Sequence, residues 1–270
     1  MPFPSLRTLA CGLLLLSAPA AFAQTPHTVQ LQDLTWTEIR DQVQAGKTTI
    51  IIPIGGTEQS GPYIAVGKHN ARAAFLSQKI AEHLGNALVA PVVSYVPEGG
   101  TAPPSSHMRF PGTITMPDAV FEQMLEAAAQ SFAVHGFRNI VLLGDHGGYQ
   151  KDLERVAAKL NKSWGGKARV IVPPEYYATS SEGFNQILRQ HGIKDDEIGT
   201  HAGLADTSLQ LAVDPQMVRL GKLQDGPKLG AADGVYGGDP RRSAADLGQL
   251  GVNAIVVNTV NALRRDTQAH

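Results

Sequence analysis

Residues 48–62, TTIIIPIGGTEQSGP, decide the fold, because an apolar run passes there directly into a glycine-rich polar loop. The run from Thr48 to Ile54 is short and rich in β-branched side chains, which is typical of a strand buried in a parallel sheet. Residues 139–148, NIVLLGDHGG, repeat this form. Ligands of open α/β sheets bind beyond the carboxyl ends of the strands, so we expect a functional site in these loops.

Strand and helix patterns alternate outward from these segments, from about residue 35 to the C-terminus. Further strands are expected at residues 87–96 and 168–172, and helices at residues 36–45, 71–84, 117–135, 151–162, 205–213 and 243–263. The first helix has a capping-box spacing at Thr35 and Glu38. The longest irregular stretches are residues 55–70, 97–115 and 193–201. Repeated βα units predict one α/β domain over residues 24–270, with a mostly parallel sheet between helices.

The first 23 residues are expected to be a cleavable signal peptide. Arg7 precedes an apolar run from Leu9 to Ala20, and the small-x-small pattern of residues 21–23 suits a signal peptidase. The run is too short to span about 30 Å of hydrocarbon, so no stable membrane insertion is expected after cleavage. The mature protein is therefore predicted to be periplasmic or secreted.

Charge and cysteine content restrict the chemistry. Lys and Arg total 23 against 24 Asp and Glu, and this net charge of -1 argues against electrostatic binding of nucleic acid. The single cysteine, Cys11, lies within the expected signal peptide. A mature chain without cysteine must hold any metal through His, Asp or Glu. Any covalent nucleophile would be Ser, Thr, Lys or a carboxylate.

Three polar segments could carry this chemistry. Glu58 and His69 bracket one strand-end loop, either as metal ligands or as a backbone cap and a surface residue. His146 lies between glycines at the end of another strand, where a metal ligand is more plausible than a phosphate loop, since the phosphate-loop spacings are absent. In residues 201–208, HAGLADTS, Asp206 is either a site residue or a helix N-cap. A Ser-His-Asp hydrolase is disfavoured because the chain has no Gly-x-Ser-x-Gly elbow.

Taken in order, five segments resemble motifs of the creatininase (creatinine amidohydrolase) family. Residues 52–62, IPIGGTEQSGP, resemble its P-x-G-S-x-E-Q-H-G-P opening, and residues 107–113, HMRFPGT, its H-x-x-F-P-G-T segment. The other matches are residues 146–148 to the core of N-G-H-G-G-N, residues 201–208 to H-A-G-x-x-E-T-S, and residues 234–240, GVYGGDP, to G-V-x-G-D-P. The resemblance covers about residues 48–262.

The resemblance implies a three-layer α/β/α fold, usually in a homo-oligomer. It also implies metal-dependent hydrolysis of an amide-type C–N bond in a small molecule such as a cyclic amide, a formamide or a peptide-like compound. The family fixes this reaction type better than it fixes the substrate.

The departures from the family pattern concern its dinuclear metal centre. The family Asp that bridges two ions, eleven residues after the opening Glu, is His69 in this chain. Ser60 replaces a His that serves the second ion, Tyr63 replaces a further His, Asp145 replaces a Gly, and the Glu of E-T-S is shortened to Asp206. A neutral imidazole offers one metal-facing nitrogen and cannot bridge two cations. We therefore expect a mononuclear site.

The resemblance then implies a site for one divalent ion with an open position for water. The expected ligands are Glu58, His69, His146 and Asp206, and zinc is the expected ion, with manganese and iron as alternatives. The ion would activate a water molecule as the nucleophile, with His201 as the acid that protonates the departing nitrogen and Asp206 as either ligand or general base. Pocket positions are assigned to Ser60, Tyr63, His107 and Asp145. The alternative is a non-catalytic metal- or ligand-binding protein that retains the fold.

Overall fold

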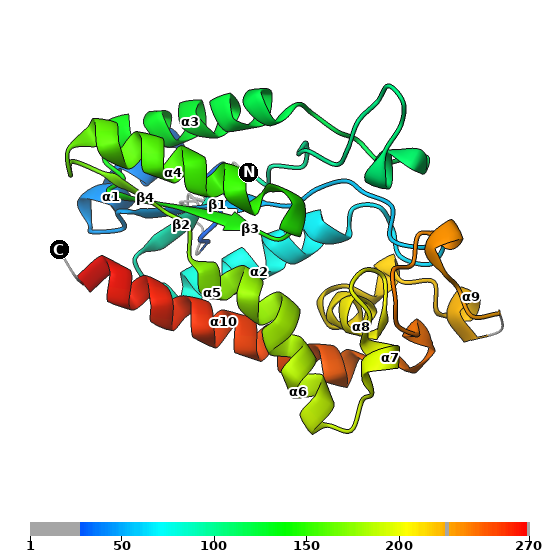
Figure 1. The fold of residues 1–270 in the computed structure, drawn as a ribbon. Coiled ribbons are helices and arrows are strands. Elements are labelled where there is room, and N and C mark those ends of the chain that lie inside the picture. Colours follow the sequence, from blue (N-terminus) through cyan, green and yellow to red (C-terminus); the bar gives the residue numbers. More distant parts are fainter. Residues whose placement is uncertain (1–27, 225–226, 269–270) are drawn as a thin grey trace, which may run out of the picture.

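The computed structural model describes residues 28–224 and 227–268, and the expected signal peptide lies outside them (Figure 1). Within these residues the strands form one parallel sheet in the order β2-β1-β3-β4. Their bounds are Thr49–Ile54 for β1, Ala87–Val89 for β2, Asn139–Gly144 for β3 and Arg169–Ile171 for β4. Ile54 pairs with Gly144, so the loops after β1 and β3 start side by side.

Helices cover both faces of this sheet and form a three-layer α/β/α fold, as predicted (Figure 1). Successive side chains of a strand point to opposite faces, so Ile51 lies in one core cluster while Ile50 and Ile52 lie in the other. One face packs against α1 (Trp36–Gln44), α3 (Asp118–Val134) and α4 (Gln150–Trp164). The other packs against α2 (Lys68–Leu84), α5 (Pro174–Ala178), α6 (Phe184–Gln190), α8 (Leu204–Val213) and α10 (Ala245–Gln268).

Most expected elements are confirmed to within a few residues. The capping box of α1 is present, because Thr35 Oγ1 accepts from the Glu38 N–H and Glu38 Oε2 accepts from the Thr35 N–H. The strand expected at residues 87–96 was too long. The strand β2 ends at Val89, and Pro91, which has no N–H to donate, follows two residues later. Beyond it the chain keeps only isolated bridges, such as Ile54 to Val93.

The segment between β4 and α8 is largely helical, and these helices were not expected from the sequence. It contains α5, a π-helical turn at Thr179–Gly183, α6 and the short α7 (Asp195–Ile198), which interrupts a stretch expected to be irregular. These helices are too short for a clear 3.6-residue pattern. They are fixed by burial of Tyr176, Phe184 and Leu188 in the sheet-facing core.

A third apolar cluster positions the loop after β1. Tyr63 and Ile64 from this loop pack against Ala202, Leu211 and Val218, and further along the chain Leu223 of α9 (Leu220–Gln224) and Val235 join them. The loop is thereby held over the start of α8. Among the described residues no helix is both long and apolar enough to cross a membrane.

Candidate metal centre

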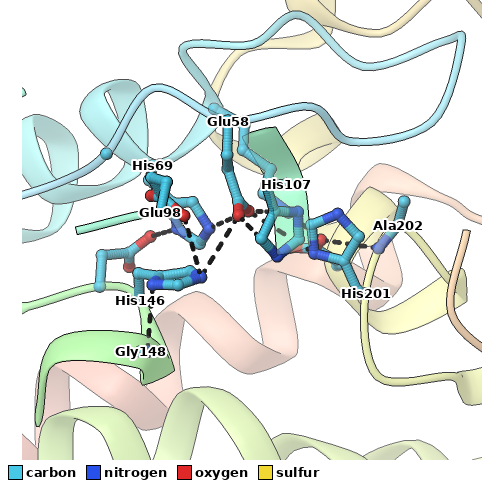
Figure 2. Close-up of polar contacts among 12 residues, drawn as sticks. Glu58, His69, Glu98, His107, His146, Gly148, His201 and Ala202 are labelled. Carbon is cyan, nitrogen blue, oxygen red and sulfur yellow. Dashed lines mark hydrogen bonds and ion pairs between the residues drawn. The ribbon is translucent and has the colours of Figure 1, made fainter. Parts of the chain in front are cut away.

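Glu58, in the loop after β1, lies at the centre of the site with its side chain fully buried. Its Oε1 lies 2.8 Å from His69 Nε2 and 3.4 Å from Lys68 Nζ. Its Oε2 has no hydrogen-bond partner among the described residues, but it lies 3.2 Å from His107 Nε2 and 3.3 Å from His146 Nε2. Burial alone would raise the pKa of Glu58, but Lys68 and His69 hold it well below its usual range. Figure 2 shows the imidazoles arranged around this carboxylate.

Glu98 is a second buried carboxyl group in the same place. Neither of its oxygens has a hydrogen-bond partner within the described part of the chain, and Oε2 lies 3.6 Å from His146 Nε2. Burial and the nearby Glu58 carboxylate raise the pKa of Glu98 to about 9. Gly56 makes room for this group, because a Cβ at Gly56 would lie 2.7 Å from Glu98 Oε1. An isolated buried carboxyl group of this kind is costly unless a cation compensates it.

These two carboxyl groups and two imidazoles fit one divalent metal ion. The ligand atoms of Glu58, Glu98, His107 and His146 all lie within 4.8 Å of one another. Two nitrogens and two carboxylate oxygens are a donor set that zinc, manganese and iron accept. Burial lowers the pKa of His107, which keeps that ring neutral, as a ligand must be. His146 accepts from the Gly148 N–H at Nδ1, so Nε2 is the nitrogen that faces the carboxylates.

His69, at the second position of α2, was expected to bind metal. Its ring lies between the carboxylates of Asp145 and Glu58. Its Nδ1 is 2.6 Å from Asp145 Oδ2 and its Nε2 contacts Glu58 Oε1. Arg72 Nε donates to the same Asp145 oxygen at 2.9 Å, and Tyr176 donates to the other oxygen at 2.9 Å. Burial alone would raise the pKa of Asp145, but Arg72 and His69 hold it below its usual value. In this geometry both ring nitrogens of His69 are occupied.

Asp206, the other expected ligand, is paired with the cations of α2. Its Oδ2 contacts Lys68 Nζ and accepts from the Ala202 N–H at 2.9 Å, while its Oδ1 contacts Arg72 Nη1. Burial alone would raise the pKa of Asp206, but Lys68 and Arg72 hold it well below its usual range. The structure thus places Asp206 in an ion-pair network next to the four-residue group rather than in it.

His201 lies on the opposite side of Glu58 from His69. Its Nε2 donates to the Gln59 carbonyl oxygen at 2.9 Å, which leaves Nδ1 with a lone pair 3.5 Å from Glu58 Oε1. Burial and the Lys68 charge lower the pKa of His201 to about 3. The ring is therefore neutral near pH 7.

A cavity of about 370 Å³ opens beside these groups and could receive a small molecule. It is bordered by Lys68, Arg72, His107, Asp145, Tyr177, Ser181, Asn185 and His201, among others. Of the residues expected in the pocket, His107 and Asp145 border it. Ser60 and Tyr63 are instead buried, and Tyr63 donates to the Ala202 carbonyl.

Three residues of the site, Glu98, Lys68 and Arg72, were not predicted from the sequence. Glu98 lies in the irregular stretch 97–115 and precedes two glycines, but it belongs to no motif. Lys68 and Arg72 flank His69 at helical spacing, and this was the available signal, because residues three and four apart share one face of a helix.

Fold and site together define a class of protein: a three-layer α/β/α protein whose strand-end loops gather carboxylates and imidazoles suited to a divalent metal. A family model described as creatinine amidohydrolase matches residues 32–263. The chain belongs to the creatininase family.

Relatives and solved structures agree with this assignment. The creatinine amidohydrolase of Pseudomonas putida is 26% identical over 206 residues, which cover 74% of this chain and 77% of that protein. The mycofactocin precursor peptide peptidase of Mycolicibacterium smegmatis is 31% identical over 116 residues, 41% of this chain and 44% of that protein. A mutant creatininase structure described as a Zn-Zn type has a TM-score of 0.71 at 24% identity and covers 89% of this chain and 99% of that one. By their names, both relatives hydrolyse amide bonds.

Proposed function

We propose that this protein is a metal-dependent amidohydrolase that cleaves an amide-type C–N bond of a small molecule at a single divalent ion. The observation that carries the proposal is the pair of buried carboxyl groups, Glu58 and Glu98, whose unpartnered oxygens face His107 and His146. These four residues would hold the ion. Glu58 and His146 are also ligands implied by the sequence motifs, and the reaction type is that of the named relatives.

Zinc is the ion we favour, because two imidazoles and two carboxylates suit it and a related fold is described with it. When bound, such an ion supplies Lewis acidity toward a carbonyl oxygen and lowers the pKa of a water molecule to about 7. Glu98 must lose its proton for the ion to bind, and the cation compensates the charge that burial otherwise disfavours.

His201 is the group that moves the proton in this reaction. Its Nδ1 lies 3.5 Å from Glu58 Oε1, beside the proposed metal site. It accepts a proton from the attacking water as the C–O bond forms. It then donates that proton to the departing nitrogen as the C–N bond breaks, so that an acid and an amine leave. The Gln59 carbonyl, which accepts from Nε2, keeps the ring oriented throughout.

Turnover of a substrate panel tests the proposal. Zinc-loaded and metal-free protein are compared on small lactams, formamides and short peptides, with Glu58→Gln and Glu98→Gln as test variants. Glu82→Gln, an exposed carboxylate on α2, is the matched control. We expect metal-dependent hydrolysis of at least one class, lost in both test variants and kept in the control. Zinc binding with no turnover of any member would favour the non-catalytic binding protein instead.

The amino-terminal sequence supports a second, separate proposal, that the enzyme acts after export, in the periplasm or outside the cell. Fractionation of cells that express the full chain would test this, and retention in the cytoplasm with residues 1–23 still attached would refute it.

A further inference from the structure

The two oxygens of Glu58 have opposite surroundings. Oε1 faces the nitrogens of His69 and Lys68 from the first turn of α2, whereas Oε2 faces His107 and His146 and has no hydrogen-bond partner among the residues described. We propose that Asp145 and His69 form a positioning relay that anchors Oε1 and turns Oε2 toward a single metal ion, with His69 outside the coordination shell. This inference rests on the proposed metal site.

The contacts of His69 place its ring beside the four-residue group of Glu58, Glu98, His107 and His146, outside that group. The Nδ1 of His69 faces Asp145 at 2.6 Å and its Nε2 faces Glu58 at 2.8 Å. Arg72 Nη2 also lies 3.0 Å from Nδ1, so each ring nitrogen of His69 already has a polar partner, and neither is among the ligand atoms that Glu58, Glu98, His107 and His146 bring together. Arg72 and Tyr176 donate to Asp145 and keep it an acceptor.

Lys68 and Arg72 already pair with the carboxylates that a second metal ion would need as ligands. Lys68 is 1% exposed, and its Nζ contacts both Glu58 Oε1 and Asp206 Oδ2. Arg72 takes the other oxygen of Asp206. Because a buried ammonium and a guanidinium already compensate these carboxylates, a second dication there would meet fixed positive charge at close range.

One turn of helix α2 provides the imidazole and the two cations of this arrangement, and the loop after β3 provides Asp145. Lys68 and Arg72 are four residues apart and share one face of α2, and His69 lies next to Lys68. Their side chains contact Glu58 after β1, Asp145 after β3 and Asp206 of α8. Charge-assisted hydrogen bonds of this kind orient a ligating carboxylate from outside the coordination shell. Loss of such a partner weakens metal binding by roughly 10- to 100-fold without removing a ligand.

Zinc X-ray absorption together with a zinc-binding titration tests the relay. The test variants are His69→Gln and Asp145→Asn. The control for loss of a ligand is His146→Gln, and the control for a neutral change is His83→Gln, an exposed histidine on the same helix. We expect one zinc per wild-type chain, and both test variants to bind zinc roughly 10- to 100-fold more weakly with unchanged imidazole scattering. The double variant should lose no more zinc affinity than either single variant, because the two residues act through the same contact with Glu58.

Each other outcome has a defined meaning. A loss of imidazole scattering in His69→Gln equal to that in His146→Gln makes His69 a ligand and overturns the relay. Unchanged zinc affinity in Asp145→Asn, or two zinc ions per wild-type chain, overturns it as well, and neither result depends on the folding of His69→Gln. The first two outcomes leave the proposed hydrolase intact, whereas two zinc ions per chain also contradict its single-ion site. A wild-type protein that binds no zinc contradicts the proposed function itself, and the relay with it.

Discussion

Replacing Glu98 by Gln should stabilise the metal-free protein, and the gain should grow with pH. Burial and the Glu58 carboxylate raise the pKa of Glu98 to about 9 in the folded protein, against 4.5 for an unperturbed Glu side chain in the unfolded chain. A raised pKa contributes stability that is present below pH 4.5 and is lost as pH rises toward 9. Between these two pH values Glu98 is ionised in the unfolded chain but protonated in the folded protein. The free energy of unfolding therefore falls by about 1.36 kcal/mol per pH unit. Gln is neutral in both states and avoids this loss.

At pH 7.5 the solution is three pH units above 4.5, so the stability gained by Glu98→Gln is at most about 4 kcal/mol. Part of the rise in the pKa of Glu98 comes from the neighbouring Glu58 carboxylate. We therefore expect Glu98→Gln to raise the free energy of unfolding by about 2 to 4 kcal/mol. Because about 1 kcal/mol shifts Tm by roughly 2 to 4 °C in a domain of this size, the variant should melt about 5 to 10 °C higher.

Unfolding of wild type and Glu98→Gln in a chelating buffer at pH 4.5, 6 and 7.5 measures this gain. The two proteins should have similar stability at pH 4.5 and diverge steadily above it. Saturating zinc should make the wild type the more stable of the two proteins, since it alone keeps all four ligands. Free zinc at 1,000 times Kd adds about 4 kcal/mol to the free energy of unfolding. A difference that does not depend on pH, or that shrinks as pH rises, would refute the account of Glu98 as a destabilised carboxyl group.

Three further changes probe other parts of the account. His201→Asn should lower kcat by about 100- to 10,000-fold in a turnover assay while zinc content stays the same, and a matching loss of zinc would contradict its role in proton transfer. Gly248→Ala should destabilise the protein by more than about 2 kcal/mol in chemical unfolding, because its Cβ would lie 1.8 Å from the Ser208 carbonyl oxygen where α10 crosses α8. Gly221→Ala, whose Cβ meets no described atom within 4 Å, is its control and should be close to neutral. Thr35→Ala should cost about 1 kcal/mol by removing the N-cap of α1, and an unchanged Tm would mean that the cap contributes nothing.

The fold was predictable because its signals are local. The β-branched runs that form β1 and β3 and the periodic apolar residues of the long helices are all read from neighbouring positions in the chain. The shorter elements could not be predicted from the sequence. The strand β2 stops where Pro91 removes a donor, and α5 to α7 are stabilised mainly by what they contact in the core.

The site was predictable only in part, for a related physical reason. Glu58 and His146 each follow a predicted strand, and neighbouring parallel strands bring their ends together. The partners of His69 could not be read, because Asp145 lies 76 positions away in the chain and only the folded sheet places the two side chains 2.6 Å apart. Glu98 carries no motif, and its importance appears only when its burial and unpartnered oxygens are known.

The central claim is that Glu58, Glu98, His107 and His146 hold one divalent ion. Zinc content per chain, measured by elemental analysis after equilibrium dialysis, tests it most directly in wild type, Glu58→Gln, Glu98→Gln and the control Glu82→Gln. The account predicts one zinc ion per chain in wild type and control, and a marked loss in both ligand variants. Two zinc ions per wild-type chain, or one that persists in both Glu58→Gln and Glu98→Gln, would contradict it.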